Sequence, residues 1–436
     1  MSFRLKDGML LGAASSATQI EGGDLGHNWN DWYRRGRIKD GSDPGRANDH
    51  YRRWKEDADL MAVMGLKVCR LGIEWSRLEP QEGVFDREAV RHYRQELKYL
   101  KKRGIRPLLT IHHFTNPGWF EEKGAFSRME NSRYYLRLVR LCVRCFGDLV
   151  NEYITINEPN VYAFNSWLVG DWPPGRHSAK KTADVMSVMA CCHIHAYQTI
   201  HRMREKMGYT DTRVSFANHI RVFEPENPQS FLQRGIASAS DWLFQRAMTI
   251  AMCTGRFLPP LCNRDHIPEG EYCDFQALNY YARSNVSWRR GPKKGAPVND
   301  LGWEICPQGI ADSAAWLYRI LPRPIYITEN GTCDNQDRFR CRYLYEHLKA
   351  LCESGLPVER YYHWCFCDNF EWLEGESARF GLVHVDYETQ KRTVKNSGQF
   401  YCALIAEGGV DDSLYEEYVA GQTYPTAGEE IRREPV

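Results

Sequence analysis

The chain has 436 residues, which exceeds the usual size of one domain but lies within the range of closed α/β barrels. Hydrophobic residues make up 43% of it and charged residues 26%, a composition typical of a globular protein with a large core. The formal net charge of +1 argues against a strongly basic surface of the kind that binds nucleic acid or an anionic membrane.

Fifteen cysteines are scattered from Cys69 to Cys402 without a regular framework of spacings. Cys142 and Cys145 form a CxxC pair, but they lie in an amphipathic helical pattern with no second pair, so no metal or redox site is predicted. The odd number and the scatter indicate free thiols in a reducing cytoplasm.

The N-terminal region bears a weak likeness to a signal peptide, with a short apolar run at 9–14 followed by small residues. Asp7 interrupts the basic start, and cleavage there would remove the first predicted strand. No segment approaches the ~20 apolar residues of a membrane span. We therefore expect a cytoplasmic protein without membrane contact.

Short apolar runs alternate with longer helical patterns along the chain, which is typical of repeated βα units. The predicted strands are Met9–Ala14, Val68–Ile73, Arg106–Ile111, Tyr153–Ile156, Arg213–Ala217, Phe275–Leu278, Ile325–Thr328 and Tyr361–Cys365. Predicted helices include His50–Met64, Glu88–Lys102, Ser132–Phe146, Val185–Met207, Gly309–Ile320 and Arg340–Glu353. Eight such units predict a (β/α)8 barrel (TIM barrel), whose functional residues follow the carboxyl ends of the strands.

No linker rich in Pro, Ser or Gly divides residues 1–410, which are predicted to form one barrel domain. Residues 411–436 are polar, with acidic pairs at 416–417 and 429–430, and are expected to form a tail outside the barrel. No function is assigned to this tail.

Two glutamates follow predicted strands in short β-branched contexts: Glu158 after the fourth strand and Glu329 after the seventh. Each one alone could be a solvated residue at a strand end. They are 171 residues apart, so only a closed fold could bring them together. Paired carboxylates are what hydrolysis of a glycosidic bond requires, one protonated for the leaving group and one ionised to meet the developing positive charge.

The chain resembles glycoside hydrolase family 1, the β-glucosidase-like retaining enzymes, from about Leu10 to Tyr401. The matching motifs, in the family's order, are Ala17-Thr-Gln-Ile-Glu-Gly22, Asp49-His-Tyr51, Arg70-Leu-Gly-Ile-Glu-Trp-Ser-Arg77, His112-His-Phe-Thr-Asn-Pro117, Ile156-Asn-Glu-Pro159, Asn279-Tyr-Tyr281, Gly302-Trp-Glu-Ile305, Thr328-Glu-Asn-Gly331 and Asp368-Asn-Phe-Glu-Trp372.

The resemblance implies that Glu158 is the general acid/base and Glu329 the nucleophile. Arg70 and Tyr281 match residues that hold the nucleophile, although a structural salt bridge and core packing remain alternatives for them. Asn157 is expected to meet the sugar's 2-hydroxyl, and Asn279 is included among the residues supporting the catalytic pair.

The remaining expected site residues bind the sugar. Gln19, His113 and Glu371 match residues that bind hydroxyls, and Trp364 and Trp372 match the aromatic floor and wall of the sugar subsite; Phe380 is included with them. Trp303 and Glu304 fall in a motif that often lies near the leaving-group side. Direct substrate contact by these two is left open.

The segment from Glu371 to Phe380 bears on the type of sugar. A phosphate at C6 would meet charge repulsion from Glu371 and the bulk of Trp372, and residues 371–380 contain no lysine that could bind it. Arg379 keeps a 6-phospho-β-glucosidase open as an alternative. The two loops after Tyr281 and Gly331 are shorter than the family usually has, which predicts an open leaving-group side.

The sequence thus predicts a retaining enzyme that hydrolyses terminal non-reducing β-D-glucosyl residues of small β-glucosides, with galactosides or fucosides as related substrates. No cofactor or metal is expected, because the protein carboxylates carry out the cleavage. A non-catalytic carbohydrate-binding barrel is the other alternative, and a homo-oligomer is compatible with the sequence.

Overall fold

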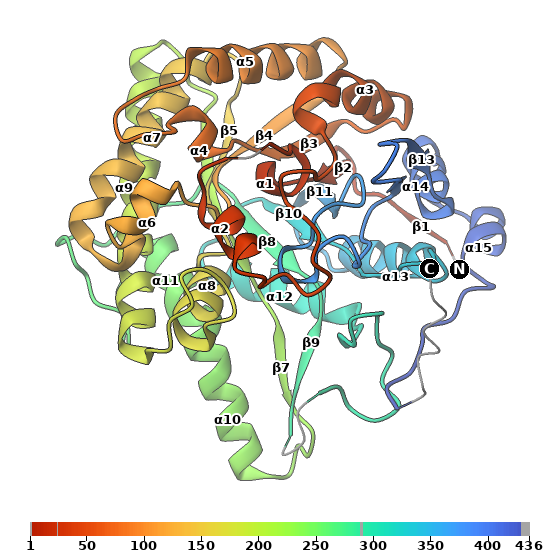
Figure 1. The fold of residues 1–436 in the computed structure, drawn as a ribbon. Coiled ribbons are helices and arrows are strands. Elements are labelled where there is room, and N and C mark those ends of the chain that lie inside the picture. The colour runs from red at the N-terminus through yellow and green to blue at the C-terminus, as the bar shows by residue number, and fades with distance from the viewer. Residues whose placement is uncertain (1, 24, 288–290, 429–436) are drawn as a thin grey trace.

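The computed structural model describes residues 2–23, 25–287 and 291–428, and at its centre lies a closed barrel of eight parallel strands (Figure 1). Around the barrel the order is β10-β11-β2-β3-β4-β5-β6-β8. The barrel strands are β2 (Leu10–Ala14), β3 (Val68–Gly72), β4 (Arg106–His112), β5 (Glu152–Asn157), β6 (Arg213–His219), β8 (Gln276–Tyr280), β10 (Ile325–Asn330) and β11 (Val358–Trp364). The predicted TIM barrel and all eight of its predicted strands are confirmed.

A helix follows each barrel strand and covers the outside of the barrel (Figure 1). These helices are α3 (His50–Val63), α5 (Arg87–Lys102), α7 (Ser132–Phe146), α9 (Ala179–Lys206), α11 (Ala247–Thr254), α12 (Gln308–Ile320), α13 (Arg340–Glu353) and α14 (Asn396–Glu407). The six predicted helices are confirmed, with α9 starting six residues earlier than predicted. Ser178 explains this start, because its hydroxyl accepts from the Lys181 N–H and caps the helix.

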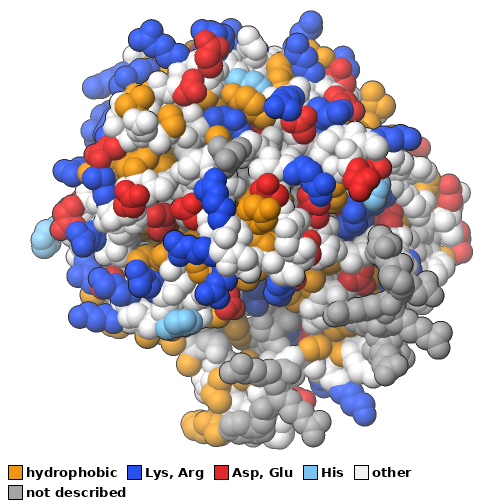
Figure 2. Space-filling view, in the orientation of Figure 1, with side chains coloured by type: hydrophobic (Ala, Val, Ile, Leu, Met, Phe, Trp, Pro, Cys, Tyr) orange, Lys and Arg blue, Asp and Glu red, His pale blue; other side chains and the backbone are white. Residues whose placement is uncertain are grey.

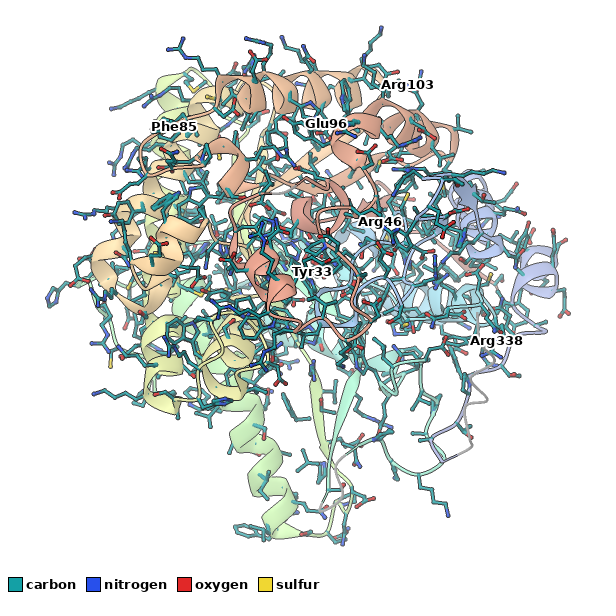
Figure 3. All side chains as sticks on the ribbon, in the orientation of Figure 1. Tyr33, Arg46, Phe85, Glu96, Arg103 and Arg338 are labelled. Atoms are coloured by element: carbon teal, nitrogen blue, oxygen red, sulfur yellow. The ribbon has the colours of Figure 1, made fainter. Side chains whose placement is uncertain are left out.

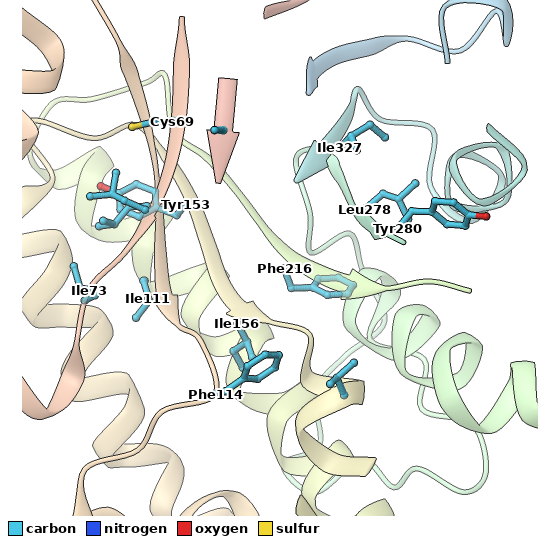
Figure 4. Packing of buried hydrophobic residues seen from close by; sticks show 14 of the residues in the cluster. Cys69, Ile73, Ile111, Phe114, Tyr153, Ile156, Phe216, Leu278, Tyr280 and Ile327 are labelled. Atoms are coloured by element: carbon cyan, nitrogen blue, oxygen red, sulfur yellow. The ribbon is translucent and has the colours of Figure 1, made fainter. Parts of the chain in front are cut away.

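Alternating side chains of the strands fill two separate apolar layers. On β3, Val68 points into the barrel, where it packs with Leu108 of β4, whereas Cys69 and Leu71 belong to the layer between strands and helices. Figure 4 shows part of this outer layer, including Cys69. Because successive strand residues face opposite sides, Arg70 also points into the barrel.

Shorter elements occupy the loops. The helices are α1 (Ala17–Ile20), α2 (Asn28–Arg34), α4 (Trp75–Leu78), α6 (Gly118–Glu122), α8 (Pro159–Ala163), α10 (Phe231–Asp241) and α15 (Asp412–Tyr418). The 3-10 turns are η1 (Ala125–Ser127), η2 (Met129–Asn131) and η5 (Trp372–Glu374), and the π-helical turns are η3 (Phe164–Val169) and η4 (Trp242–Arg246). The paired strands outside the barrel are β1 (Phe3–Arg4) with β14 (Gly409–Val410), β7 (Val222–Pro225) with β9 (Arg283–Val286), and β12 (Val383–Val385) with β13 (Arg392–Val394).

Strands β7 and β9 continue outward from the ends of two barrel strands. They pair in parallel, from Val222 with Arg283 to Pro225 with Val286. In Figure 1 they extend away from the barrel together with α10. This extension places Arg221 and Arg283 beside the barrel mouth, and its existence was not predicted from the sequence.

The described part of the polar C-terminal segment lies against the barrel domain. The Tyr424 hydroxyl donates to Glu346 of α13 at 2.8 Å, and the Tyr424 ring lies 5.7 Å from that of Phe339. The Val298 N–H donates to the Pro425 carbonyl at 2.9 Å. Residues 429–436 of the expected tail lie outside the described residues.

Basic and acidic side chains are interspersed over the face shown in Figure 2, consistent with the near-zero net charge. All fifteen cysteines are free thiols, as the sequence predicts. Within the described ranges, no helix is both long enough and apolar enough to cross a membrane.

Candidate active site

Glu158 and Glu329 lie at the carboxyl ends of β5 and β10, where the sequence places them. Glu158 adopts the left-handed conformation, with φ 41° and ψ 56°, directly before Pro159 opens α8. Such a conformation is rare for a residue with a side chain and is often found at functional sites. A backbone hydrogen bond of 2.7 Å from its N–H to the Ala217 carbonyl holds the turn.

Glu329 reaches the cavity through an irregularity in β10. The pairing register with β8 shifts between Ile327 and Glu329, and Thr328 already faces the barrel interior, where its hydroxyl donates to Asn279 at 2.6 Å. The shift lets the next side chain turn inward as well. Gly331 permits close packing after it, because an added Cβ would lie 1.9 Å from the Trp364 carbonyl oxygen.

Two donors hold the Glu329 carboxylate. Nη1 of Arg70 donates to Oε1, and the Tyr281 hydroxyl donates to Oε2. Arg70 is itself fixed by hydrogen bonds from Nε to Thr110 Oγ1 at 2.9 Å and from Nη2 to Asn157 Oδ1 at 2.6 Å. Arg70 and Tyr281 therefore make the contacts with Glu329 that the resemblance implies.

Different donors meet Glu158. Its Oε1 accepts from Asn279 Nδ2 at 2.9 Å and from His219 Nδ1 at 3.2 Å. Asn279 Nδ2 also donates to Asn157 Oδ1 at 3.0 Å, and this bond connects Glu158 with Glu329 through Asn157 and Arg70.

The two carboxylates titrate as a coupled pair, because both are buried in one site. Burial raises the pKa of Glu329 to about 7, against the opposing charge of Arg70. Burial also raises the pKa of Glu158, but His219, the hydrogen bond from Asn279 and the Arg70 charge together outweigh burial and lower that pKa. The pKa of His219 is itself lowered by burial, so its imidazole is neutral at neutral pH. The Arg70 charge favours ionised Glu329 against the effect of burial.

At the other end of the cavity, Glu371 is held by neutral donors. Its Oε2 accepts from Gln19 Nε2 at 3.2 Å and from Trp364 Nε1 at 3.4 Å. Burial raises the pKa of Glu371 to about 8, and the nearby charges of Glu329 and Glu158 add to this rise. The hydroxyl donors of a bound sugar would favour the ionised form in return.

Aromatic rings line the space between these carboxylates. His113 lies nearly parallel to Trp364 and to Trp372, with centroid distances of 5.8 Å to each. Burial keeps the pKa of His113 well below its usual value, so the ring is neutral and can bond a hydroxyl. Phe380 closes one side and lies 6.0 Å from Trp303.

These groups surround one cavity of about 210 Å³. The predicted site residues that line it are His113, Glu158, Tyr281, Glu329, Trp364, Glu371, Trp372 and Phe380, and Trp303 lines it as well. Four further predicted residues, Gln19, Arg70, Asn157 and Asn279, contact the lining residues by hydrogen bonds. Glu304 does not line this cavity and pairs with Arg283 at 2.8 Å.

Several lining residues were missed by the sequence analysis: Phe114, Val161, Asn165, Trp172, His219, Arg221, Leu301, Leu373 and Glu374. His219 could have been found, because it is a polar residue just past the predicted fifth strand. That strand, β6, runs two residues beyond its predicted end at Ala217, to His219. Trp172 carries no comparable signal, since it comes from the long segment before α9.

Among the described residues, no group of three or more His, Cys, Asp or Glu side chains is arranged to hold a metal ion.

Comparisons with known proteins agree with this geometry. The sequence model of glycosyl hydrolase family 1 matches residues 1–258 and 269–410. Beta-glucosidase A of Thermotoga maritima is 30% identical over 453 aligned positions, covering 94% of this chain and 99% of the relative.

Solved structures of similar proteins share the fold. A beta-glycosidase from Pyrococcus horikoshii superposes with a TM-score of 0.87 at 30% identity, covering 97% of this chain and 99% of that chain. A beta-glucosidase from Thermotoga maritima in complex with deoxynojirimycin gives a TM-score of 0.84 at 28% identity, covering 94% and 100%. The chain belongs to glycosyl hydrolase family 1 and is an O-glycoside hydrolase of the β-glucosidase type.

Proposed function

We propose that the protein hydrolyses the terminal non-reducing β-D-glucosyl residue of small, unphosphorylated β-glucosides with retention of anomeric configuration. The observation that carries the proposal is the unequal environment of two carboxylates in one cavity. Glu329 is held by a cation and a hydroxyl, whereas Glu158 is held by neutral groups.

In the first step Glu329 attacks the anomeric carbon, and the glycosidic C–O bond breaks as Glu158 gives its proton to the leaving oxygen. A covalent glycosyl-enzyme ester remains on Glu329. In the second step Glu158, now ionised, takes a proton from water, whose oxygen attacks the same carbon and releases Glu329.

Arg70 and Tyr281 favour the ionised nucleophile and orient it, because both donate to its oxygens. Asn157 lies beside Arg70 and His113, where its amide can meet the sugar's 2-hydroxyl. That bond strengthens as positive charge develops on the ring.

The sugar preference rests on Glu371. Gln19, Glu371 and Trp364 form a hydrogen-bonded group whose donors and acceptors suit hydroxyls. Arg379 is the one basic residue of 371–380 that could bind a phosphate at C6 of the sugar. However, it donates to Asp368 at 3.1 Å and does not line the cavity. Unphosphorylated glucosides are therefore favoured over 6-phosphoglucosides.

We also infer a reducing cytoplasm as the place of action, since fifteen free thiols, ten of them buried, suit a reducing compartment.

The direct test follows the first product by NMR. 4-Nitrophenyl β-D-glucoside should yield β-glucose before mutarotation, and its 6-phosphate should react far more slowly. An α-anomer as first product would contradict retention, and faster cleavage of the 6-phosphate would contradict the sugar preference.

A further inference from the structure

A second hollow of about 200 Å³ adjoins the catalytic cavity. The two share four lining side chains: His219, Arg221, Tyr281 and Trp303. His219 donates to Glu158, so the shared wall lies on the side of the acid/base, away from Gln19 and Glu371. In the proposed reaction this is the side from which the leaving group departs.

The two arginines that line this hollow differ in their partners. Arg283 is paired with Glu304 at 2.8 Å and with Glu224 at 2.7 Å. For Arg221 no carboxylate lies within ion-pair distance anywhere in the described ranges of the chain. Because Glu304 neutralises Arg283, the Arg221 charge is left without a counterion in the hollow.

The environment of Arg221 makes that charge available to a ligand. Its guanidinium lies 5.5 Å from the centroid of the Phe244 ring, and burial lowers its pKa. The Gln245 side chain holds the Arg221 backbone with two hydrogen bonds. It accepts from the Arg221 N–H at 2.8 Å and donates to the Arg221 carbonyl at 2.9 Å. A partly dry cation on a fixed backbone attracts an anion more strongly than a solvated surface arginine does.

One of the five guanidinium donors is already used. Arg221 Nε donates to His219 Nε2 at 2.8 Å, and since Arg cannot accept, His219 carries its proton on Nδ1, the atom that faces Glu158. The four N–H groups on Nη1 and Nη2 have no hydrogen-bond acceptor among the described residues. They form the planar edge that binds a carboxylate with two parallel hydrogen bonds.

We propose that Arg221 forms a leaving-group subsite for aglycones that carry an anionic group, with a carboxylate as the reference ligand, close to the glycosidic bond. The inference rests on the proposed β-glucosidase activity and names the class of aglycone for that same site. Trp303 and Tyr281 supply the aromatic walls of the subsite, and Arg221 supplies its charge.

The test compares two substrates that differ only in this charge: 3-(carboxymethyl)phenyl β-D-glucoside and its primary amide. The methylene group insulates the phenol, so the two leaving groups are matched in reactivity. Wild-type enzyme should prefer the carboxylate about five- to fiftyfold in kcat/KM, a range appropriate to one charge-assisted bidentate contact. Arg221→Gln should bring this ratio to about one.

The ratio separates binding of the anion from support of the acid/base. Loss of the hydrogen bond to His219 would slow both substrates alike and would leave the ratio unchanged. Arg202→Gln, which removes an equal charge from an exposed position on α9, should keep the wild-type ratio. Raising salt from about 0.05 to about 0.5 M should reduce the wild-type ratio without any mutation, because ions screen the contact.

A wild-type ratio near one, or an unchanged ratio in Arg221→Gln, would overturn the subsite while 4-nitrophenyl β-D-glucoside is still cleaved. If the wild type cleaves no β-glucoside at all, the proposed function fails together with the subsite. Should Arg221→Gln not fold, a salt-independent preference in the wild type is the contradicting result.

Discussion

Arg70 connects Glu329 with the neighbouring polar side chains of the cavity. Its guanidinium contacts Glu329, Asn157 and Thr110, so one buried cation from β3 joins side chains of β10, β5 and β4. Its effect on Glu329 is one of charge as well as position, because it favours the ionised form of Glu329 at a site where burial opposes it.

Removal of the acid/base should affect substrates according to their leaving groups. Glu158→Ala should slow glucosides of poor leaving groups by about a hundredfold or more, and activated aryl glucosides far less, since only the former need protonation. The measurement is kcat/KM over a series of phenol leaving groups. Added azide should partly restore turnover by attacking the glycosyl-enzyme, and equal losses across the series would contradict the assignment.

The pH dependence follows from the nucleophile. Burial raises the pKa of Glu329 to about 7, and only the ionised carboxylate can attack, so kcat/KM should fall as the pH falls through about 7. Glu158→Gln removes a charge that adds to this rise, so the acid fall of its residual activity on 2,4-dinitrophenyl glucoside should move to lower pH.

A matched control addresses the neighbouring group. Glu371 has a pKa of about 8 and titrates in the same range, but Glu371→Gln should retain the fall near pH 7. An acid fall that stays in place in Glu158→Gln and disappears in Glu371→Gln would assign the titration to the sugar subsite instead.

Glu371 should accept hydrogen bonds from the hydroxyls at C4 and C6 of the bound sugar. Glu371→Ala should lower kcat/KM for a glucoside by about thirtyfold to about a thousandfold, from the ~2–4 kcal/mol lost when one partner of a buried charged hydrogen bond is removed. A 4,6-dideoxy glucoside should lose little from the same change. Equal losses on both substrates would show that Glu371 supports the fold or the catalytic pair.

At the scale of elements, a buried histidine ties the first helices of the barrel together. His50 of α3 contacts Asp57 through Nδ1 at 2.7 Å and Glu96 of α5 through Nε2 at 2.9 Å, and Arg392 of β13 reaches Asp57 at 2.9 Å. Figure 3 labels Glu96 on α5. Burial alone would lower the pKa of His50, but Glu96 and Asp57 outweigh it and raise that pKa to about 10.

This histidine predicts a loss of stability at alkaline pH. The folded pKa exceeds the unfolded value of about 6.5, so the charged His50 stabilises the fold fully below that value and its contribution fades as the pH rises towards 10. Each pH unit in this window should remove up to ~1.4 kcal/mol from the free energy of unfolding. Denaturant titrations of wild type and His50→Gln should differ in slope against pH, and parallel curves would contradict the account.

The alternation of strand and helix could be predicted because each barrel strand is buried on both faces and reads as a short apolar run. The extension of β7, β9 and α10 could not, since strands such as Arg283–Val286 are only half-buried and have no apolar pattern. Arg221 lies where β6 gives way to this extension, so no pattern in its own segment indicated it. Local register shifts such as that of Glu329 depend on neighbouring strands and leave no mark in their own segment.

At the scale of the whole molecule, closure of the barrel brings together residues that the sequence separates widely. Glu158 and Glu329 share a cavity because β5 and β10 both end at the same face of one closed sheet. The motifs predicted which residues meet there. The sequence predicts only that the leaving-group side is open. The positive charge of Arg221 on that side follows from the folded arrangement, in which Glu304 pairs with Arg283.

Trapping of the glycosyl-enzyme tests the central claim most directly. Incubation with 2,4-dinitrophenyl 2-deoxy-2-fluoro-β-D-glucoside should give one stable adduct, and peptide mass spectrometry should place it on Glu329. Glu329→Gln should form no adduct under the same conditions. A label on Glu158, Glu371 or any other residue of the wild-type enzyme would contradict the assignment of Glu329 as the nucleophile.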